Sequence, residues 1–185
     1  MNRSLRFLTA VSALALAALS ARAADPGYLD PGAFKIAAGC EFVEVNLHMP
    51  MLKLAALFVG HDDPEAAALI RNLKHVRVNV IGYDESNRTE TADRVQAIRA
   101  ELAAQGWTQM VTVRQNCSAE DVAIYVKSRG EEAIDGIVVT VFDPAKHEAV
   151  FVNIVGNIKP EQLASLGRGL RIDHLSFGAA THKGA

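Results

Sequence analysis

The densest group of potentially reactive side chains is His61-Asp62-Asp63. A histidine beside aspartates occurs in metal-dependent phosphohydrolases, but a protein metal site usually takes three or four ligands and nothing nearby supplies the others. Capping explains the group instead, because Gly60 can end one helix while Asp63 caps the next and Pro64 fits its first position. We therefore predict a helix boundary here, not a metal site.

The remaining histidines, serines and glycines form no catalytic motif. The sequence has no His-Glu-x-x-His and no Gly-x-Ser-x-Gly. Gly167-Arg168-Gly169 follows a predicted helix, whereas a phosphate-binding loop precedes one. The other histidines are scattered: His48, His75, His147, His174 and His182. We predict a non-enzymatic protein with no catalytic residue, no metal and no cofactor.

The two cysteines, Cys40 and Cys117, are too few for a disulfide scaffold, and they form no Cys-x-x-Cys pair. In an oxidising compartment their bond would close a long loop, worth about 4 kcal/mol in the chain-entropy model. The sequence leaves open whether they are bonded or are two separate thiols. A bond would place the start of the first strand beside the end of the third.

The N-terminus has the three parts of a secretory signal. Arg3 and Arg6 precede an apolar run at residues 7–19, and small residues at positions 21 and 23 suit cleavage after Ala23. The apolar run is much shorter than the roughly 20 residues that a membrane-spanning helix needs. We expect the protein to be periplasmic or secreted.

Composition and charge exclude several classes. Of 185 residues, 50% are hydrophobic, as in ordinary globular proteins. Residues 24–185 keep 16 of the 19 basic side chains and all 21 acidic ones, a net charge of −5. An acidic chain without a basic cluster is unsuited to nucleic acid. Its length fits one domain, which we place at residues 24–170, with residues 171–185 as a loosely held tail.

Hydrophobic periodicity predicts an α+β fold: an antiparallel-rich sheet of about six strands with helices on one face. The last four strands have short connections and should form an antiparallel meander. The strand–helix–strand unit before them should make a right-handed crossover between parallel strands. The predicted strands are 42–47, 76–83, 108–115, 121–128, 135–143 and 147–155. The predicted helices are 51–59, 64–73, 87–105 and a short one from Pro160.

The third predicted helix has both a start signal and a buried stripe. Asn87 is placed to cap it, and Glu90 three residues later has capping-box spacing. Val95, Ile98 and Leu102 recur on one face and should point into the core.

Residues 49–60 are apolar nearly all round, with Lys53 as the one charge. A helix of this kind is usually buried in the core. If part of it is exposed, it forms a surface for a partner protein, a ligand or a membrane. Leu54, Leu57 and Phe58 share one face and are the candidate surface residues.

Several segments resemble a family of exported bacterial proteins known as domain of unknown function 4252. They are residues 43–47 (VEVNL), 69–78 (LIRNLKHVRV), 106–107 (GW), 152–158 (VNIVGNI) and 163–167 (LASLG). The resemblance implies an envelope-associated protein and brings no catalytic residue or cofactor with it. Some members carry a lipid-attachment cysteine, which this chain lacks.

Together these features predict a protein-binding or envelope-sensing module. The alternative is a carrier of small molecules or lipids with an apolar cavity, and a hydrolase is the third interpretation. The expected partner is an envelope protein or a small apolar ligand, with at most peripheral membrane contact.

Signal cleavage gives the first testable prediction. N-terminal sequencing or intact mass of the protein from the envelope fraction should show a chain that begins at Ala24. An envelope form that retains Met1 would contradict this prediction.

Overall fold

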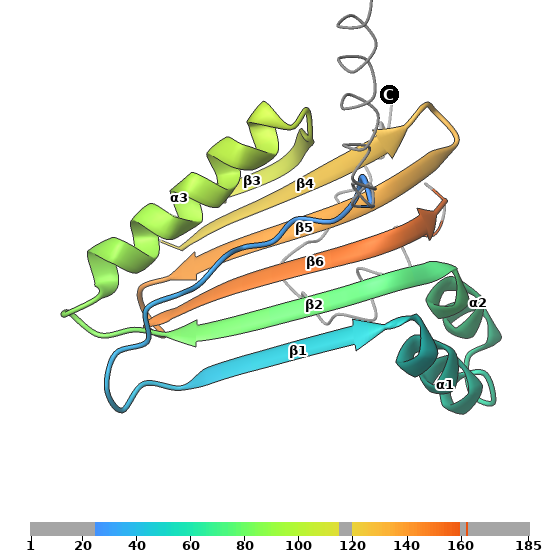
Figure 1. Cartoon of the computed structure of the whole chain (residues 1–185), viewed down its shortest axis with the longest axis horizontal. Helices are drawn as coiled ribbons and strands as arrows, with labels where there is room; N and C mark the ends of the chain where they lie inside the picture. Colours follow the sequence, from blue (N-terminus) through green and yellow to red (C-terminus); the bar gives the residue numbers. More distant parts are fainter. Residues whose placement is uncertain (1–24, 115–119, 160–161, 163–185) are drawn as a thin grey trace, which may run out of the picture.

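The computed structural model describes residues 25–114, 120–159 and 162, which form one α+β domain of three helices and a six-stranded sheet (Figure 1). The sheet order is β1-β2-β6-β5-β4-β3, and neighbouring strands are antiparallel throughout. The strands are β1 (Phe42–His48), β2 (Leu73–Gly82), β3 (Thr108–Arg114), β4 (Asp121–Arg129), β5 (Ala133–Asp143) and β6 (Glu148–Ile158). The helices are α1 (Met49–Val59), α2 (Pro64–Asn72) and α3 (Arg88–Ala104).

Within the described residues no helix has the length and apolar character to cross a bilayer.

The strand order confirms the predicted meander β3-β4-β5-β6 and adds a pairing that the sequence did not reveal. β6 pairs with β5 on one side and with β2 on the other, and β2 pairs with the edge strand β1. β2 and β3 run in the same direction, because four antiparallel steps separate them. They are not neighbours, however, so the segment that contains α3 connects strands on opposite sides of the sheet (Figure 1).

The two faces of the sheet differ in chemistry. On one face, which we call the valine face, a row of β-branched side chains crosses five strands: Val45, Val78, Val152, Val139 and Ile124. The other face, which we call the α3 face, carries more polar side chains and packs against α3. Strand alternation separates the two sets, since successive side chains point to opposite faces.

The helices lie on both faces, whereas the sequence analysis placed them on one. Leu52 of α1 and Leu69 of α2 pack with Val139 on the valine face. Ile98 of α3 packs with Val138 on the α3 face. Because Val138 and Val139 are adjacent in β5, their side chains point to opposite faces, and so the two groups of helices cover opposite faces.

The predicted side-chain cap is present at the start of α2 and absent at the start of α3. Asp63 caps α2 as predicted, with its Oδ1 accepting a 2.9 Å hydrogen bond from the Ala66 amide. Asn87 precedes α3 but makes no capping bond. Its buried side chain accepts from the Asp84 amide and donates to the Lys35 carbonyl, so it ties the lead-in segment to the helix start. The predicted buried stripe of α3 is confirmed: Val95, Ile98 and Leu102.

The lead-in segment, residues 25–41, crosses the α3 face in front of β5 and β6 (Figure 1). Asn153 of β6 is fully buried and anchors it. Its Oδ1 accepts from the Leu29 amide at 3.0 Å, while its Nδ2 donates to the carbonyls of Gly27 at 3.0 Å and Ile137 at 3.2 Å. The approach requires glycine, because a Cβ on Gly27 would lie 1.9 Å from the Asp135 carbonyl oxygen.

We predict that Asn153→Ala lowers the free energy of unfolding by about 2–4 kcal/mol, because it strands three buried backbone groups. Urea denaturation measures this change. Asn157→Ala is the matched control, since Asn157 is exposed in the same strand, and it should change stability by no more than about 0.5 kcal/mol. Equal effects of the two substitutions would contradict the anchoring role of Asn153.

Candidate functional site

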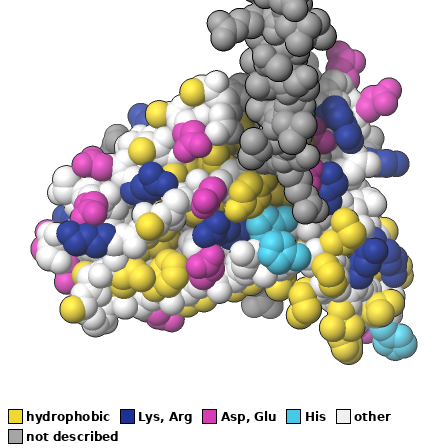
Figure 2. Space-filling view, in the orientation of Figure 1, with side chains coloured by type: hydrophobic (Ala, Val, Ile, Leu, Met, Phe, Trp, Pro, Cys, Tyr) yellow, Lys and Arg dark blue, Asp and Glu magenta, His cyan; other side chains and the backbone are white. Residues whose placement is uncertain are grey.

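Exposed apolar side chains are concentrated in one part of the surface. Among the described residues, all but one of the exposed large hydrophobic side chains lie between residues 36 and 58, and the exception is Met110 in β3. The clustered residues are Ile36, Phe42, Val43, Val45, Met49, Met51, Leu54, Leu57 and Phe58. We call this region the β1–α1 surface. Figure 2 shows hydrophobic side chains gathered at its lower right, where α1 lies in Figure 1. Exposed apolar side chains that gather on one part of a surface, as those around α1 do in Figure 2, indicate an interaction site.

The structure resolves which side of α1 is buried. Leu52 and Ala56, one turn apart, face the core. Leu54 is exposed, Leu57 is 69% exposed and Phe58 is 73% exposed. The default interpretation of this helix as wholly buried in the core is therefore wrong, and the three candidate surface residues lie together on its outer side. The sequence could not distinguish the sides, because α1 is apolar in nearly every direction.

The turn between α1 and α2 fixes the position of this outer side. The amides of Asp62 and Asp63 both donate to the Val59 carbonyl, at 3.1 and 2.8 Å. Gly60 sits where the helices touch, since a Cβ there would lie 3.3 Å from the Ala67 Cβ. His61 and Asp62 are exposed in this turn, so the residues first considered for a metal site serve as a helix connection.

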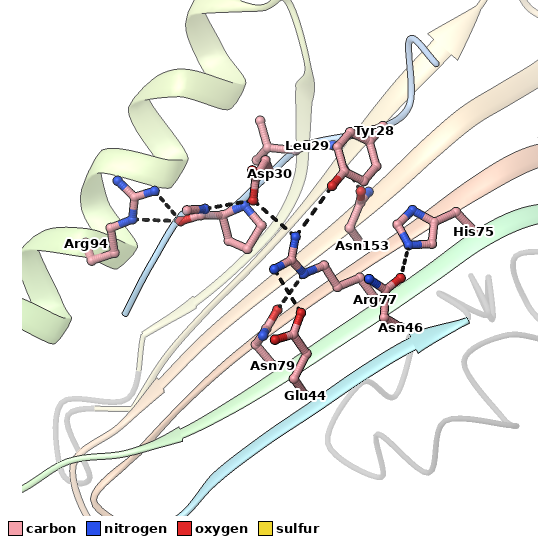
Figure 3. Close-up of polar contacts among 12 residues, drawn as sticks. Tyr28, Leu29, Asp30, Glu44, Asn46, His75, Arg77, Asn79, Arg94 and Asn153 are labelled. Atoms are coloured by element: carbon pink, nitrogen blue, oxygen red, sulfur yellow. Dashed lines mark hydrogen bonds and ion pairs between the residues drawn. The ribbon is translucent and has the colours of Figure 1, made fainter. Parts of the chain in front are cut away.

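A partly buried arginine holds β1 in place from the α3 face (Figure 3). Arg77 of β2 forms ion pairs with Glu44 of β1 at 3.0 Å and with Asp30 of the lead-in segment at 3.1 Å. Its Nε also donates to the Asn79 Oδ1 at 3.2 Å. A guanidinium with carboxylates on two sides is already neutralised, so this cluster connects three segments and does not offer an open anion site.

A stack of three rings lies next to Arg77, at the end of β1 where α1 begins. His48 and His75 are paired across β1 and β2, and their ring centroids are 4.6 Å apart with nearly parallel planes. Tyr28 stacks on the other side of His75 at 5.2 Å, and the Asn46 Oδ1 accepts a short hydrogen bond from the His75 Nε2. Burial, followed by the neighbouring charges of His48 and Arg77, holds the pKa of His75 below its ordinary value.

The candidate disulfide is not resolved by the structure. Cys40 carries a free thiol just before β1, and Cys117 lies outside the described residues. β1 and β3 occupy opposite edges of the sheet, so the start of the first strand does not lie beside the third. The pairing stays a prediction. The proposed signal, the helix after Pro160 and the tail at residues 171–185 also fall outside the described residues, apart from position 162.

The polar clusters are a feature that sequence reasoning missed. A signal was present, because His75, Arg77 and Asn79 alternate on one side of β2 and face Glu44, Asn46 and His48 across the strand pair. No local pattern indicated that the first and second strands pair.

Two comparisons bear on the identity of the chain. A family model described as "Domain of unknown function (DUF4252)" matches residues 39–166. The match begins just before β1 and extends past the end of β6, so it spans all three helices and six strands. No curated protein matches this sequence.

The ring stack predicts a pH-dependent stability. Because the pKa of His75 is lowered on folding, the folded state disfavours the imidazolium. The stabilisation that neutral His75 gives the folded state is complete above the unfolded pKa of about 6.5. It declines as the pH falls through that value toward the folded pKa.

His75→Phe should therefore flatten the pH profile, since phenylalanine keeps the ring between His48 and Tyr28 but cannot titrate. Urea denaturation between about pH 5 and 8 compares the two proteins. The wild type should lose more stability toward acid than the variant, and identical slopes would contradict the assignment.

Proposed function

The chain belongs to the DUF4252 family, whose description gives no activity, and from that premise we propose that this protein is a non-enzymatic binding module of the cell envelope. It docks a partner protein through the outer side of α1. The observation that carries the proposal is the exposure of Leu57 and Phe58 on a helix that the core holds firmly.

The spacing on α1 suits insertion into a groove. Met51, Leu54 and Phe58 follow an i, i+3, i+7 pattern, by which amphipathic helices are commonly recognised. Each of these side chains contributes roughly 1.5–3 kcal/mol when fully buried against apolar atoms. Leu52 and Ala56 pack beneath the helix, so the exposed side is presented by a fixed scaffold and little order has to be gained on binding.

Charge favours a protein over a lipid surface as the partner. Membrane-surface helices carry lysine and arginine around their apolar side, which attract anionic headgroups. α1 has Lys53 as its one charged residue, while Asp62 and Asp63 are exposed in the turn after it. Arg71 of α2 is exposed beside Gly60, so the border carries charges of both signs and lacks the cluster of lysine and arginine that attracts an anionic bilayer. A border of mixed charge suits a protein groove with polar edges.

The surface depressions support binding over the carrier alternative. Three depressions in the described part of the chain have volumes of about 250–310 Å³. Each includes charged side chains in its wall, such as Arg94, Arg99 and Lys146. Ligand pockets usually have volumes of about 300–1,000 Å³ and few polar groups, so these depressions lie at or below the lower end of that size range and have charged walls.

Site-specific photocrosslinking in cells tests the proposal. A photoreactive residue at Leu57 should give a discrete adduct with one protein, and the same residue at Met110 should not. Met110 is the matched control because it is also exposed, at 61%, but lies in β3 on the opposite edge of the sheet. Adducts with lipid only, or equal adducts at both positions, would overturn the proposal.

Phe58→Ser should weaken binding to the crosslinked partner by about tenfold or more, because a buried aromatic anchor costs on the order of 2 kcal/mol when truncated. Titration calorimetry with the purified partner measures the affinity. The substitution should change the free energy of unfolding by no more than about 0.5 kcal/mol, since Phe58 is exposed in the free protein. Unchanged affinity would contradict the role of this side chain, and Met110→Ser is the control.

A further inference from the structure

We propose that β1 pairs with β1 of a second copy of this chain, antiparallel and centred on Val45. This inference goes beyond docking through α1, because it concerns the backbone edge of the sheet. It rests on three observations: the exposure of the strand, the direction of its free backbone groups and the self-complementarity of its residues.

β1 lacks most of the features that usually protect a sheet edge, and its one charged residue, Glu44, is paired with Arg77. Natural edge strands carry proline, lysine, inward charges or bulges, which discourage pairing with another chain. β1 contains no proline and no lysine or arginine, and its pairing with β2 shows no register shift. Six of its seven residues are exposed, with Leu47 as the exception. The opposite edge strand, β3, has a register shift between Gln109 and Val111 and ends in Arg114.

The hydrogen bond before β1 shows which backbone groups point outward. The Gly82 amide donates to the Glu41 carbonyl at 2.8 Å, so Glu41 is a hydrogen-bonded position opposite β2. Hydrogen-bonded positions alternate along an antiparallel pair. Val43, Val45 and Leu47 therefore bond to β2. The residues with amide and carbonyl groups on the open edge are Phe42, Glu44, Asn46 and His48.

These outward groups restrict the register of a symmetric pair. Outward residues must lie opposite outward residues, and the register centred on Val45 meets this condition along the whole strand. It places Glu44 opposite the partner's Asn46, and Val43 opposite the partner's Leu47. The register centred on Glu44 would place two carboxylates directly opposite each other, which is destabilising.

The resulting interface is complementary in polarity. Val43, Val45 and Leu47 of both copies extend the valine face across the two-fold axis, and they bury apolar area that is exposed in the single chain. Each Glu44 meets an amide of the partner while Arg77 of its own chain neutralises it from β2. In Figure 1 no element of the described residues covers the outer edge of β1, and α1 lies beyond its C-terminal end. Two antiparallel copies would therefore carry their α1 helices at opposite ends.

Disulfide trapping tests this register in the full-length protein with both natural cysteines replaced, Cys40→Ser and Cys117→Ser. Val45 lies on the proposed axis in a non-hydrogen-bonded pair, where opposite Cβ atoms are about 4.5–5.5 Å apart and sulfurs can join. Val45→Cys should give a covalent dimer on mild oxidation. Val43→Cys is the matched control, with 38% exposure against 36%, and should stay monomeric because Leu47 faces it.

Sedimentation of the wild type and of Val45→Lys completes the test. The wild type should sediment as a dimer, and Val45→Lys should sediment as a folded monomer, because two ammonium groups would face each other on the axis. A monomeric wild type, a dimer that survives Val45→Lys, or equal crosslinking at positions 43 and 45 would overturn the proposal. Crosslinking through Leu57 should persist in Val45→Lys, so failure of the β1 pair and failure of α1 docking are distinguishable.

Discussion

The position of β6 is the constraint on which the rest of the structure depends. β6 is the last strand of the described residues, yet it lies near the centre of the sheet, with β2 on one side and β5 on the other. On one face its Ile154 packs with the helical hairpin α1–α2, and on the other its Phe151 packs with α3. Asn153 in the same strand fixes the lead-in segment. A single strand thus joins the β1–β2 pair, the meander and both layers of helices, and the domain can form a complete core only after β6 has paired.

The local elements of this fold could be predicted from the sequence, because strand and helix periodicities are short-range signals. The meander, the Asp63 cap and the buried stripe of α3 follow from neighbouring residues. The insertion of β6 beside β2 could not be predicted, since the pairing of Val78 with Val152 depends on contacts between distant residues. The distribution of helices over both faces was missed for the same reason. Strands such as β5 are apolar on both sides, so their pattern does not indicate that two layers cover them.

The candidate site was only partly predictable. Leu54, Leu57 and Phe58 were identified as one face of a helix, but periodicity could not decide between burial and exposure, because Leu52 and Ala56 are equally apolar. The structure decides this through α2, whose capped start and tight turn from α1 orient the helix. Asn87 was predicted to cap α3, but it makes no capping bond. Its sequence context favours a cap, but a buried amide gains more by bonding the Lys35 carbonyl and the Asp84 amide, which would otherwise lack partners.

The alternation that builds the core also determines which groups of β1 would meet a second copy in the proposed pairing. Its odd-numbered residues bond to β2 and add to the valine face, so its even-numbered residues direct their side chains to the α3 face and their backbone groups to the edge. Arg77 forms an ion pair with Glu44, and His75 forms a hydrogen bond with Asn46. These contacts from β2 restrain β1 on the α3 face. A strand that is already rigid loses little conformational entropy when a second strand pairs with it. In the proposed pairing, the polar clusters would contribute by fixing the position of β1 before the second copy binds.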